Sequence, residues 1–144
     1  MSSSTYEESG SIASDLNMKQ SREVIRVLLV DDHAMVRQGL RSFLSTYPDL
    51  EVVGEASNGE EALQSVQMLS PSVVLMDINM PRLNGIEATA RIKHSHPHVV
   101  VLGLSVNVEE DHQRAMTAAG ATAVLSKGAV VERLYDEIIR SFEC

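Results

Sequence analysis

Five polar side chains follow short runs of apolar, strand-forming residues, and their chemistry suits the transfer of a phosphoryl group. They are three carboxylates, one hydroxyl and one ammonium group: Asp31, Asp32, Asp77, Ser105 and Lys127. Crowded carboxylates repel one another, and a hard divalent cation such as Mg²⁺, which prefers oxygen ligands, would neutralise them. The lysine supplies a point charge for a phosphoryl oxygen, and the serine supplies a hydrogen-bond donor.

Asp77 is the best candidate for the nucleophile of such a reaction. It ends a run that we expect to form the central strand, within the stretch VVLMDINMPRLNG at residues 73–85. A carboxylate can attack phosphorus to give an acyl phosphate, and the protein then needs only to position the groups and neutralise charge. The proline-containing turn after Asp77 leaves room for a phosphoryl group and can lend a backbone carbonyl to the metal.

Each of these residues, taken alone, has an ordinary structural explanation. An aspartate or serine at the end of a strand usually caps a helix or belongs to a turn, and a lone lysine is usually solvated. Their coincidence at one edge of the predicted sheet favours a site instead. We interpret His33, beside the acidic pair, as a residue in the first turn of a helix and not as a general base.

Strands that alternate with helices explain why these residues should meet. Apolar runs at 26–30, 73–76 and 99–104 predict strands buried on both faces, and weaker runs at 51–56 and 121–125 predict strands nearer an edge. Parallel strands joined by right-handed helical crossovers form an open sheet with helices on both faces, which is an α/β fold. Ligands of such sheets bind beyond the carboxyl ends of the strands.

Five amphipathic stretches follow the strands. The first has apolar residues at helical spacing as far as Tyr47 and is ended by Pro48. The next two end before Pro71 and Pro97, and the fourth ends at Gly120, which suits a glycine cap. The last presents one apolar face, formed by Val131, Leu134, Ile138 and Phe142.

The composition narrows the class of protein further. A formal net charge of −8 argues against direct binding of nucleic acid by this segment, and no apolar stretch approaches the roughly 20 residues of a membrane helix. The only cysteine is Cys144, so no intrachain disulfide is possible, which favours a cytoplasmic location. Residues 1–23 are rich in serine and charge and predict a flexible N-terminal tail, and residues 24–144 form one domain.

Four motifs, in this order and at these separations, resemble the receiver (CheY-like) domain of two-component response regulators. They are VLLVDDH, VVLMDINMPRLNG, VLGLS and AVLSK, and the similarity runs from residue 24 to the C-terminus. The stretches DDHAMVRQGLRSFL and MDINMPRLNGIEAT are most similar to the NarL/FixJ (LuxR-type) transcriptional regulators. The resemblance implies a flavodoxin-like (βα)5 fold, a doubly wound parallel sheet with strand order 2-1-3-4-5 in a three-layer α/β/α arrangement.

The resemblance also implies roles for the residues at the strand ends. Asp77 would accept a phosphoryl group from a sensor histidine kinase or a histidine phosphotransfer protein. Mg²⁺ would be held by Asp32, Asp77 and the backbone carbonyl of Asn79, with Asp31 assisting through water. The domain would not be an enzyme in the usual sense, because the group that it modifies is its own Asp77. It would catalyse its own phosphorylation, lose the phosphoryl group slowly, and relay the signal to transcription by a conformational change.

Ser105 and Lys127 would bind the phosphoryl oxygens, and Ser105 and Val124 occupy the switch positions. Receivers usually carry tyrosine or phenylalanine where this chain has Val124, so the usual aromatic rotation cannot occur. Proline often follows the lysine, and here Gly128 does, so no cis proline would brace that loop.

Other functions and architectures remain open. A receiver-like interaction module that needs no phosphorylation is the main alternative, which Val124 motivates. A phosphatase of the aspartyl-nucleophile type would need an aspartate two residues after the nucleophile, where this chain has Asn79. A flavin-binding protein would need a phosphate-binding loop after the first strand, where this chain has the acidic DDHAMV. The alternating histidines of HSHPH (residues 94–98) predict a solvated loop. The chain fits a stand-alone receiver, the receiver half of a DNA-binding regulator or part of a hybrid kinase, with a homodimer possible.

Overall fold

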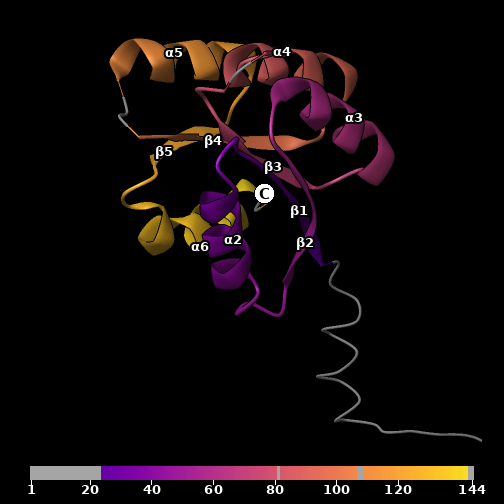
Figure 1. The fold of residues 1–144 in the computed structure, drawn as a ribbon, viewed down its shortest axis with the longest axis vertical. Coiled ribbons are helices and arrows are strands. Elements are labelled where there is room, and N and C mark those ends of the chain that lie inside the picture. The colour runs from indigo at the N-terminus through magenta and orange to yellow at the C-terminus, as the bar shows by residue number, and fades with distance from the viewer. Residues whose placement is uncertain (1–23, 81, 107–108, 143–144) are drawn as a thin grey trace, which may run out of the picture.

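The computed structural model describes residues 24–80, 82–106 and 109–142. Strands and helices alternate along this part of the chain (Figure 1): β1 (Ile25–Val30), α2 (Ala34–Leu44), β2 (Leu50–Ala56), α3 (Gly59–Leu69), β3 (Val73–Asp77), α4 (Gly85–Ser95), β4 (Val100–Ser105), α5 (Glu110–Ala119), β5 (Ala123–Ser126) and α6 (Val130–Ser141). The strands are parallel and lie in the order β2-β1-β3-β4-β5, so the predicted fold class and strand order are confirmed. The predicted tail, residues 1–23, lies outside the described residues.

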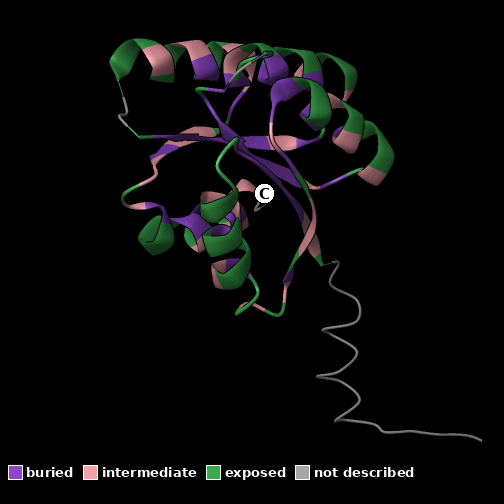
Figure 2. Cartoon of the chain, viewed as in Figure 1, coloured by how far each residue is buried: buried purple, intermediate pink, exposed green. Residues whose placement is uncertain are grey.

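The sheet lies between two layers of helices. Helices α3, α4 and α5 cover one face, and α2 and α6 cover the other (Figure 1). Alternate residues of β1 serve the two faces: Leu28 and Val30 join the core cluster beneath α3 to α5, and Val27 and Leu29 join the cluster beneath α2 and α6. The sheet is therefore buried on both sides (Figure 2), as continuous apolar strands require.

An asparagine followed by a glycine begins both α3 and α4. The side chains of Asn58 and Asn84 cap these helices by accepting hydrogen bonds from the backbone N–H three residues later, each at 2.9 Å. The N–H groups of Gly59 and Gly85 donate to the carbonyls of Leu83 and Ile78, each at 3.0 Å. Both glycines thus hold the two ends of the loop that follows β3.

The first helix is shorter than the pattern predicts. Helix α2 ends at Leu44, because the N–H groups of Thr46 and Tyr47 donate to Phe43 and Leu44 in tighter turns. Tyr47 precedes Pro48, and the proline ring disfavours a helical conformation at that position. Tyr47 still packs in the core layer, stacked on Tyr135 of α6 with ring centroids 4.0 Å apart.

The apolar face of α6 also differs from the prediction by one position. Val130, Leu134 and Ile138, spaced four residues apart, are buried, whereas Val131 is 55% exposed and Phe142 is 41% exposed. One step along a helix turns a side chain by about 100°, so Val131 leaves the face that its neighbour occupies.

The last strand is displaced toward the C-terminus from the predicted 121–125. It spans Ala123–Ser126, and this brings its carboxyl end next to Lys127.

Replacing Gly85 by alanine tests the contact between α4 and the end of β3. A β-carbon at residue 85 would lie 2.1 Å from the carbonyl oxygen of Asp77, so backbone must move. We expect Gly85→Ala to lower the free energy of unfolding by about 3 kcal/mol, measured by urea denaturation.

The matched control is Gly39→Ala, in the exposed middle of α2. A β-carbon there meets nothing within 4 Å, and replacing a helical glycine stabilises by about 0.5 to 1 kcal/mol. Equal effects of the two substitutions would contradict the role assigned to Gly85.

Candidate functional site

The carboxyl ends of four neighbouring strands bring the predicted residues to one edge of the sheet. The Lys127 ammonium, after β5, lies 2.7 Å from Asp31 Oδ2, after β1, and 3.4 Å from Asp77 Oδ1, at the end of β3. Ser105 ends β4 and is buried, and its carbonyl accepts a hydrogen bond from the Lys127 N–H at 2.8 Å. Asp32 extends the cluster, since its carboxylate lies within 4.8 Å of those of Asp31 and Asp77.

Lys127 balances the charge of two buried carboxylates. Asp31 is 1% exposed and Asp77 is 2% exposed. Partial burial by itself would lower the pKa of Lys127, but its hydrogen bond to Asp31 and the charge of Asp77 outweigh burial and raise it. The lysine therefore stays protonated and presents a positive charge beside Asp77.

The two carboxylate oxygens of Asp77 differ in their hydrogen bonding. Its Oδ1 accepts a hydrogen bond from the Asn79 N–H at 3.2 Å, whereas its buried Oδ2 has no hydrogen-bond partner among the described residues. Burial and the neighbouring charge of Asp31 raise the pKa of Asp77 to about 6, against the opposing effects of Lys127 and the Asn79 N–H. A carboxylate with such a pKa is mostly ionised at neutral pH and poorly solvated, which suits a nucleophile.

The donor set fits a hard divalent cation. Asp31 and Asp77 are buried, and Asp32 is on the exposed side of the cluster, with its side chain 30% accessible. Together they offer carboxylate oxygens within 4.8 Å of one another, and the unpartnered Asp77 Oδ2 is one that a cation would satisfy. Asn79 lies on the exposed turn beyond Asp77, where its backbone borders the same cluster.

Two residues join this region that the sequence did not identify as part of it. His33, expected in the first helical turn, is the N-cap residue of α2, and its Nδ1 lies 3.1 Å from both Asp31 Oδ1 and Asp32 Oδ1. Arg37 of the same helix donates to the Asp31 carbonyl at 2.5 Å and pairs with Glu55 of β2 at 2.8 Å. The DDH triplet was a signal for His33, but no local pattern connects Arg37 to its partners.

Val124 is half-buried and lies in register with Gly103 of β4. It packs against the core cluster beneath α3 to α5. Its short side chain is part of this packing.

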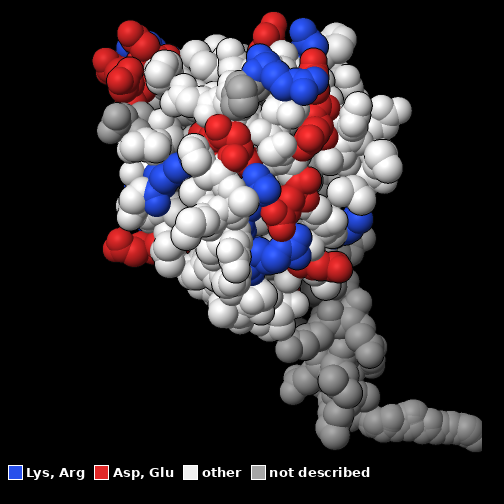
Figure 3. Space-filling model, in the orientation of Figure 1, with Lys and Arg blue, Asp and Glu red and all other residues white. Residues whose placement is uncertain are grey.

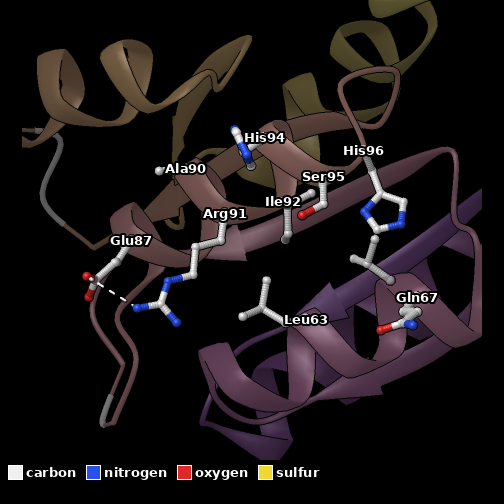
Figure 4. Close-up of a pocket in the computed structure, with 10 residues that line it drawn as sticks. Leu63, Gln67, Glu87, Ala90, Arg91, Ile92, His94, Ser95 and His96 are labelled. Carbon is white, nitrogen blue, oxygen red and sulfur yellow. Dashed lines mark ion pairs between the residues drawn. The ribbon is translucent and has the colours of Figure 1, made fainter.

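A separate groove of about 520 Å³ lies between α3 and α4, away from the acidic cluster. Leu63 extends from α3 and Arg91 from α4 toward the space between the helices, and Arg91 pairs with Glu87 at 3.7 Å (Figure 4). The HSHPH segment borders this groove through His94 and His96. The segment is a loop only in part, because His94 and Ser95 form the end of α4 and His96 is its C-cap residue.

Basic side chains of the described residues are not concentrated on the face of the molecule that Figure 3 shows. Acidic and basic side chains of the described residues intermingle there (Figure 3), whereas phosphate-backbone binding requires a concentrated basic surface. Within the described ranges, no helix is both long and apolar enough to cross a membrane.

Comparison with known proteins identifies relatives of this fold and site. Residues 27–139 match the family model described as the response regulator receiver domain. Response regulator GacA of Pseudomonas viridiflava is 41% identical over 115 residues, which cover 80% of this chain and 54% of that protein. Transcriptional regulatory protein LiaR of Bacillus subtilis is 44% identical over 117 residues, with 80% and 54% covered.

A solved structure supports the same relationship. The response regulator domain of Thermotoga maritima CheB has a TM-score of 0.77 at 35% identity, covering 82% of this chain and 96% of that chain. The family resemblance carried by the four sequence motifs is therefore confirmed. The chain spans about half the length of the curated relatives named above.

The raised pKa of Asp77 predicts how stability depends on pH. Its ordinary value is 3.8 and its folded value is about 6, so a contribution to stability that is present below pH 3.8 is lost as the pH rises through about 6. Asp77→Asn removes this cost. Without divalent metal, we expect the variant to exceed the original chain in unfolding free energy by about 2 kcal/mol at about pH 7.5.

Urea denaturation of both proteins, in EDTA, at about pH 7.5 and about pH 4.5 measures the difference. The advantage of the variant should shrink at the lower pH, where the native Asp77 is protonated. An advantage of equal size at both pH values would contradict the raised pKa.

Proposed function

The chain belongs to the response regulator receiver domain family, and we propose that it accepts a phosphoryl group on Asp77 in a Mg²⁺-dependent reaction. The observation that carries this proposal is the state of Asp77 Oδ2, a buried carboxylate oxygen that lacks a hydrogen-bond partner within the described residues. It lies at the edge of the sheet where Asp31 and Lys127 also meet. Formation of an acyl phosphate requires a nucleophilic carboxylate oxygen and nearby positive charge that neutralises the transferred phosphoryl group.

In the proposed reaction an Asp77 oxygen attacks the phosphorus of a phosphohistidine. The new P–O bond forms as the P–N bond breaks, and the imidazole nitrogen that leaves takes up a proton. Lys127 binds one phosphoryl oxygen through its ammonium group, and Ser105 donates its hydroxyl to another. Mg²⁺ held by Asp31, Asp32, Asp77 and the Asn79 carbonyl would supply neutralisation of the remaining negative charge.

The same residues offer a route for the signal. Ser105 and Lys127 follow neighbouring strands and are linked by the hydrogen bond from the Lys127 N–H to the Ser105 carbonyl. If both side chains move onto the phosphoryl group, the ends of β4 and β5 move together. Val124 lies two residues before the end of β5, so we propose that displacement of this strand, and not rotation of an aromatic ring, reports phosphorylation.

The proposal extends to the partners and the setting of the domain. The phosphoryl donor is a sensor histidine kinase or a histidine phosphotransfer protein, and the domain catalyses its own phosphorylation and slow hydrolysis. The relatives' names as response and transcriptional regulators, and their greater length, support an output in transcription through a separate DNA-binding region, with homodimerisation possible. Residues 1–23 are proposed as a tail and residues 24–144 as the receiver, and the single Cys144 favours the cytoplasm.

Phosphorylation by a small donor tests the assignment of Asp77. The purified chain is incubated with acetyl phosphate and Mg²⁺, and intact mass is recorded. We expect the mass to rise by one phosphoryl group, and we expect no rise with Asp77→Asn or with EDTA. Lys127→Met should reduce the initial rate by at least about a hundredfold, because a charge on the transferred group loses its partner.

Asp136→Asn is the matched control, since Asp136 is an exposed aspartate on α6. It should be phosphorylated like the original chain. An adduct that persists in Asp77→Asn would show that another residue is phosphorylated. A folded chain that forms no adduct would support the alternative, an interaction module that works without phosphorylation.

A further inference from the structure

We propose that His33 supplies a nitrogen ligand to the metal of the acidic cluster, so that this site prefers transition metals to Mg²⁺ more strongly than a site built from oxygen ligands alone. The inference rests on the proposed function, because it concerns the same metal. It adds a residue and a chemical preference that the carboxylates do not provide.

The spacing of three donor atoms carries the inference. His33 Nδ1 lies 3.1 Å from Asp31 Oδ1 and 3.1 Å from Asp32 Oδ1. In an octahedral site with bonds of about 2.1 Å, adjacent ligand atoms lie about 3.0 Å apart and opposite ones about 4.2 Å apart. Both separations match adjacent ligands around one ion. Without a metal, the contact to Asp31 Oδ1 is a hydrogen bond, so a bound ion would replace it and would need the His33 tautomer whose Nδ1 carries no proton.

Asp77 completes the set from the buried side. Its carboxylate oxygen lies within 4.8 Å of the other donor atoms, an upper limit slightly longer than the separation of opposite ligands, so a small closure of the set would suffice. The unpartnered Asp77 Oδ2 is an independent sign that this group is built for an additional ligand. With the Asn79 carbonyl, a nitrogen and three carboxylate oxygens fill five octahedral positions and leave one for a phosphoryl oxygen or a water.

The His33 ring does not cap the helix that it precedes and lies toward the acidic cluster. The residue has extended backbone angles, φ −102° and ψ 112°, and its side chain makes no capping hydrogen bond to α2. Its backbone N–H instead donates to Asp31 Oδ1 at 2.8 Å, which fixes the main chain beside the carboxylate. The ring is 64% exposed, so an ion can reach Nδ1 from solvent.

The type of ligand atom determines which ions bind more tightly. Mg²⁺ prefers oxygen ligands, whereas an imidazole nitrogen suits later transition metals, whose affinities rise from Mn²⁺ through Co²⁺ to Ni²⁺. Removing His33 should therefore weaken Co²⁺ binding much more than Mg²⁺ binding. Mg²⁺ would retain its carboxylate ligands.

Metal titrations of the full chain test this inference. Calorimetry with Mg²⁺ and with Co²⁺ gives both affinities for the original chain, for His33→Ala and for His98→Ala. His98 is an exposed histidine in the loop between α4 and β4, so His98→Ala serves as the matched control. We expect His33→Ala to reduce the ratio of Co²⁺ to Mg²⁺ affinity by at least about tenfold, and His98→Ala to leave it unchanged.

A spectroscopic measurement examines the bond itself. Mn²⁺ bound to the original chain should show nitrogen coupling in pulsed electron paramagnetic resonance, and the coupling should be absent from His33→Ala. Because His33 does not cap α2 through its side chain, the variant should keep its fold, which circular dichroism checks.

The outcomes separate this inference from the proposed function. An unchanged affinity ratio in His33→Ala, or bound Mn²⁺ without nitrogen coupling, would overturn the role of His33 while Mg²⁺-dependent phosphorylation of Asp77 could still be observed. Absence of metal binding in every variant would overturn both the metal site and this inference.

Discussion

The charge balance between Lys127 and the two buried carboxylates is the constraint on which the rest of the structure depends. Asp31 and Asp77 lie at the ends of neighbouring strands, where burial penalises their ionised forms. Lys127 contacts both from the end of β5. Because the three residues come from β1, β3 and β5, the cluster exists only when the parallel sheet has assembled in its observed order.

Lys127 does not fully neutralise the two carboxylates, and Asp77 is the one whose ionised form stays costly. Lys127 approaches Asp31 more closely than Asp77, and Asp77 keeps a raised pKa and an unpartnered oxygen. Such a site has a stability cost at neutral pH that a cation or a phosphoryl group with its metal can relieve. A cation that bound here and neutralised Asp77 would therefore stabilise the folded state.

Close contacts also position the backbone around Asp77. The absence of a β-carbon at Gly85 lets α4 begin against the Asp77 carbonyl, and Gly59 makes a similar approach to Leu83. On the other side of the site, Arg37 fixes the Asp31 carbonyl. These contacts come from both helical layers, so each layer contributes to the position of the carboxylates.

The sequence by itself determined the order of strands and helices, the parallel sheet and the edge at which Asp31, Asp77 and Lys127 meet. These features follow from apolar runs and helical spacing, which are local, and from the strong preference for right-handed crossovers. The motifs also identified the family. The same local patterns located the end of α2 three residues too late and selected Val131 in place of Val130, because caps and helix faces depend on contacts that spacing does not contain.

Only the tertiary structure decided how the site is completed. It brought His33 Nδ1 between two carboxylates, linked Arg37 to Asp31 and Glu55, and left Asp77 with a pKa of about 6. Each of these results depends on distances of a few ångströms between atoms of different segments, and on which of them are withdrawn from water. Hydrogen bonding and desolvation act over such distances, so residue types along the chain could indicate the chemistry but not its geometry.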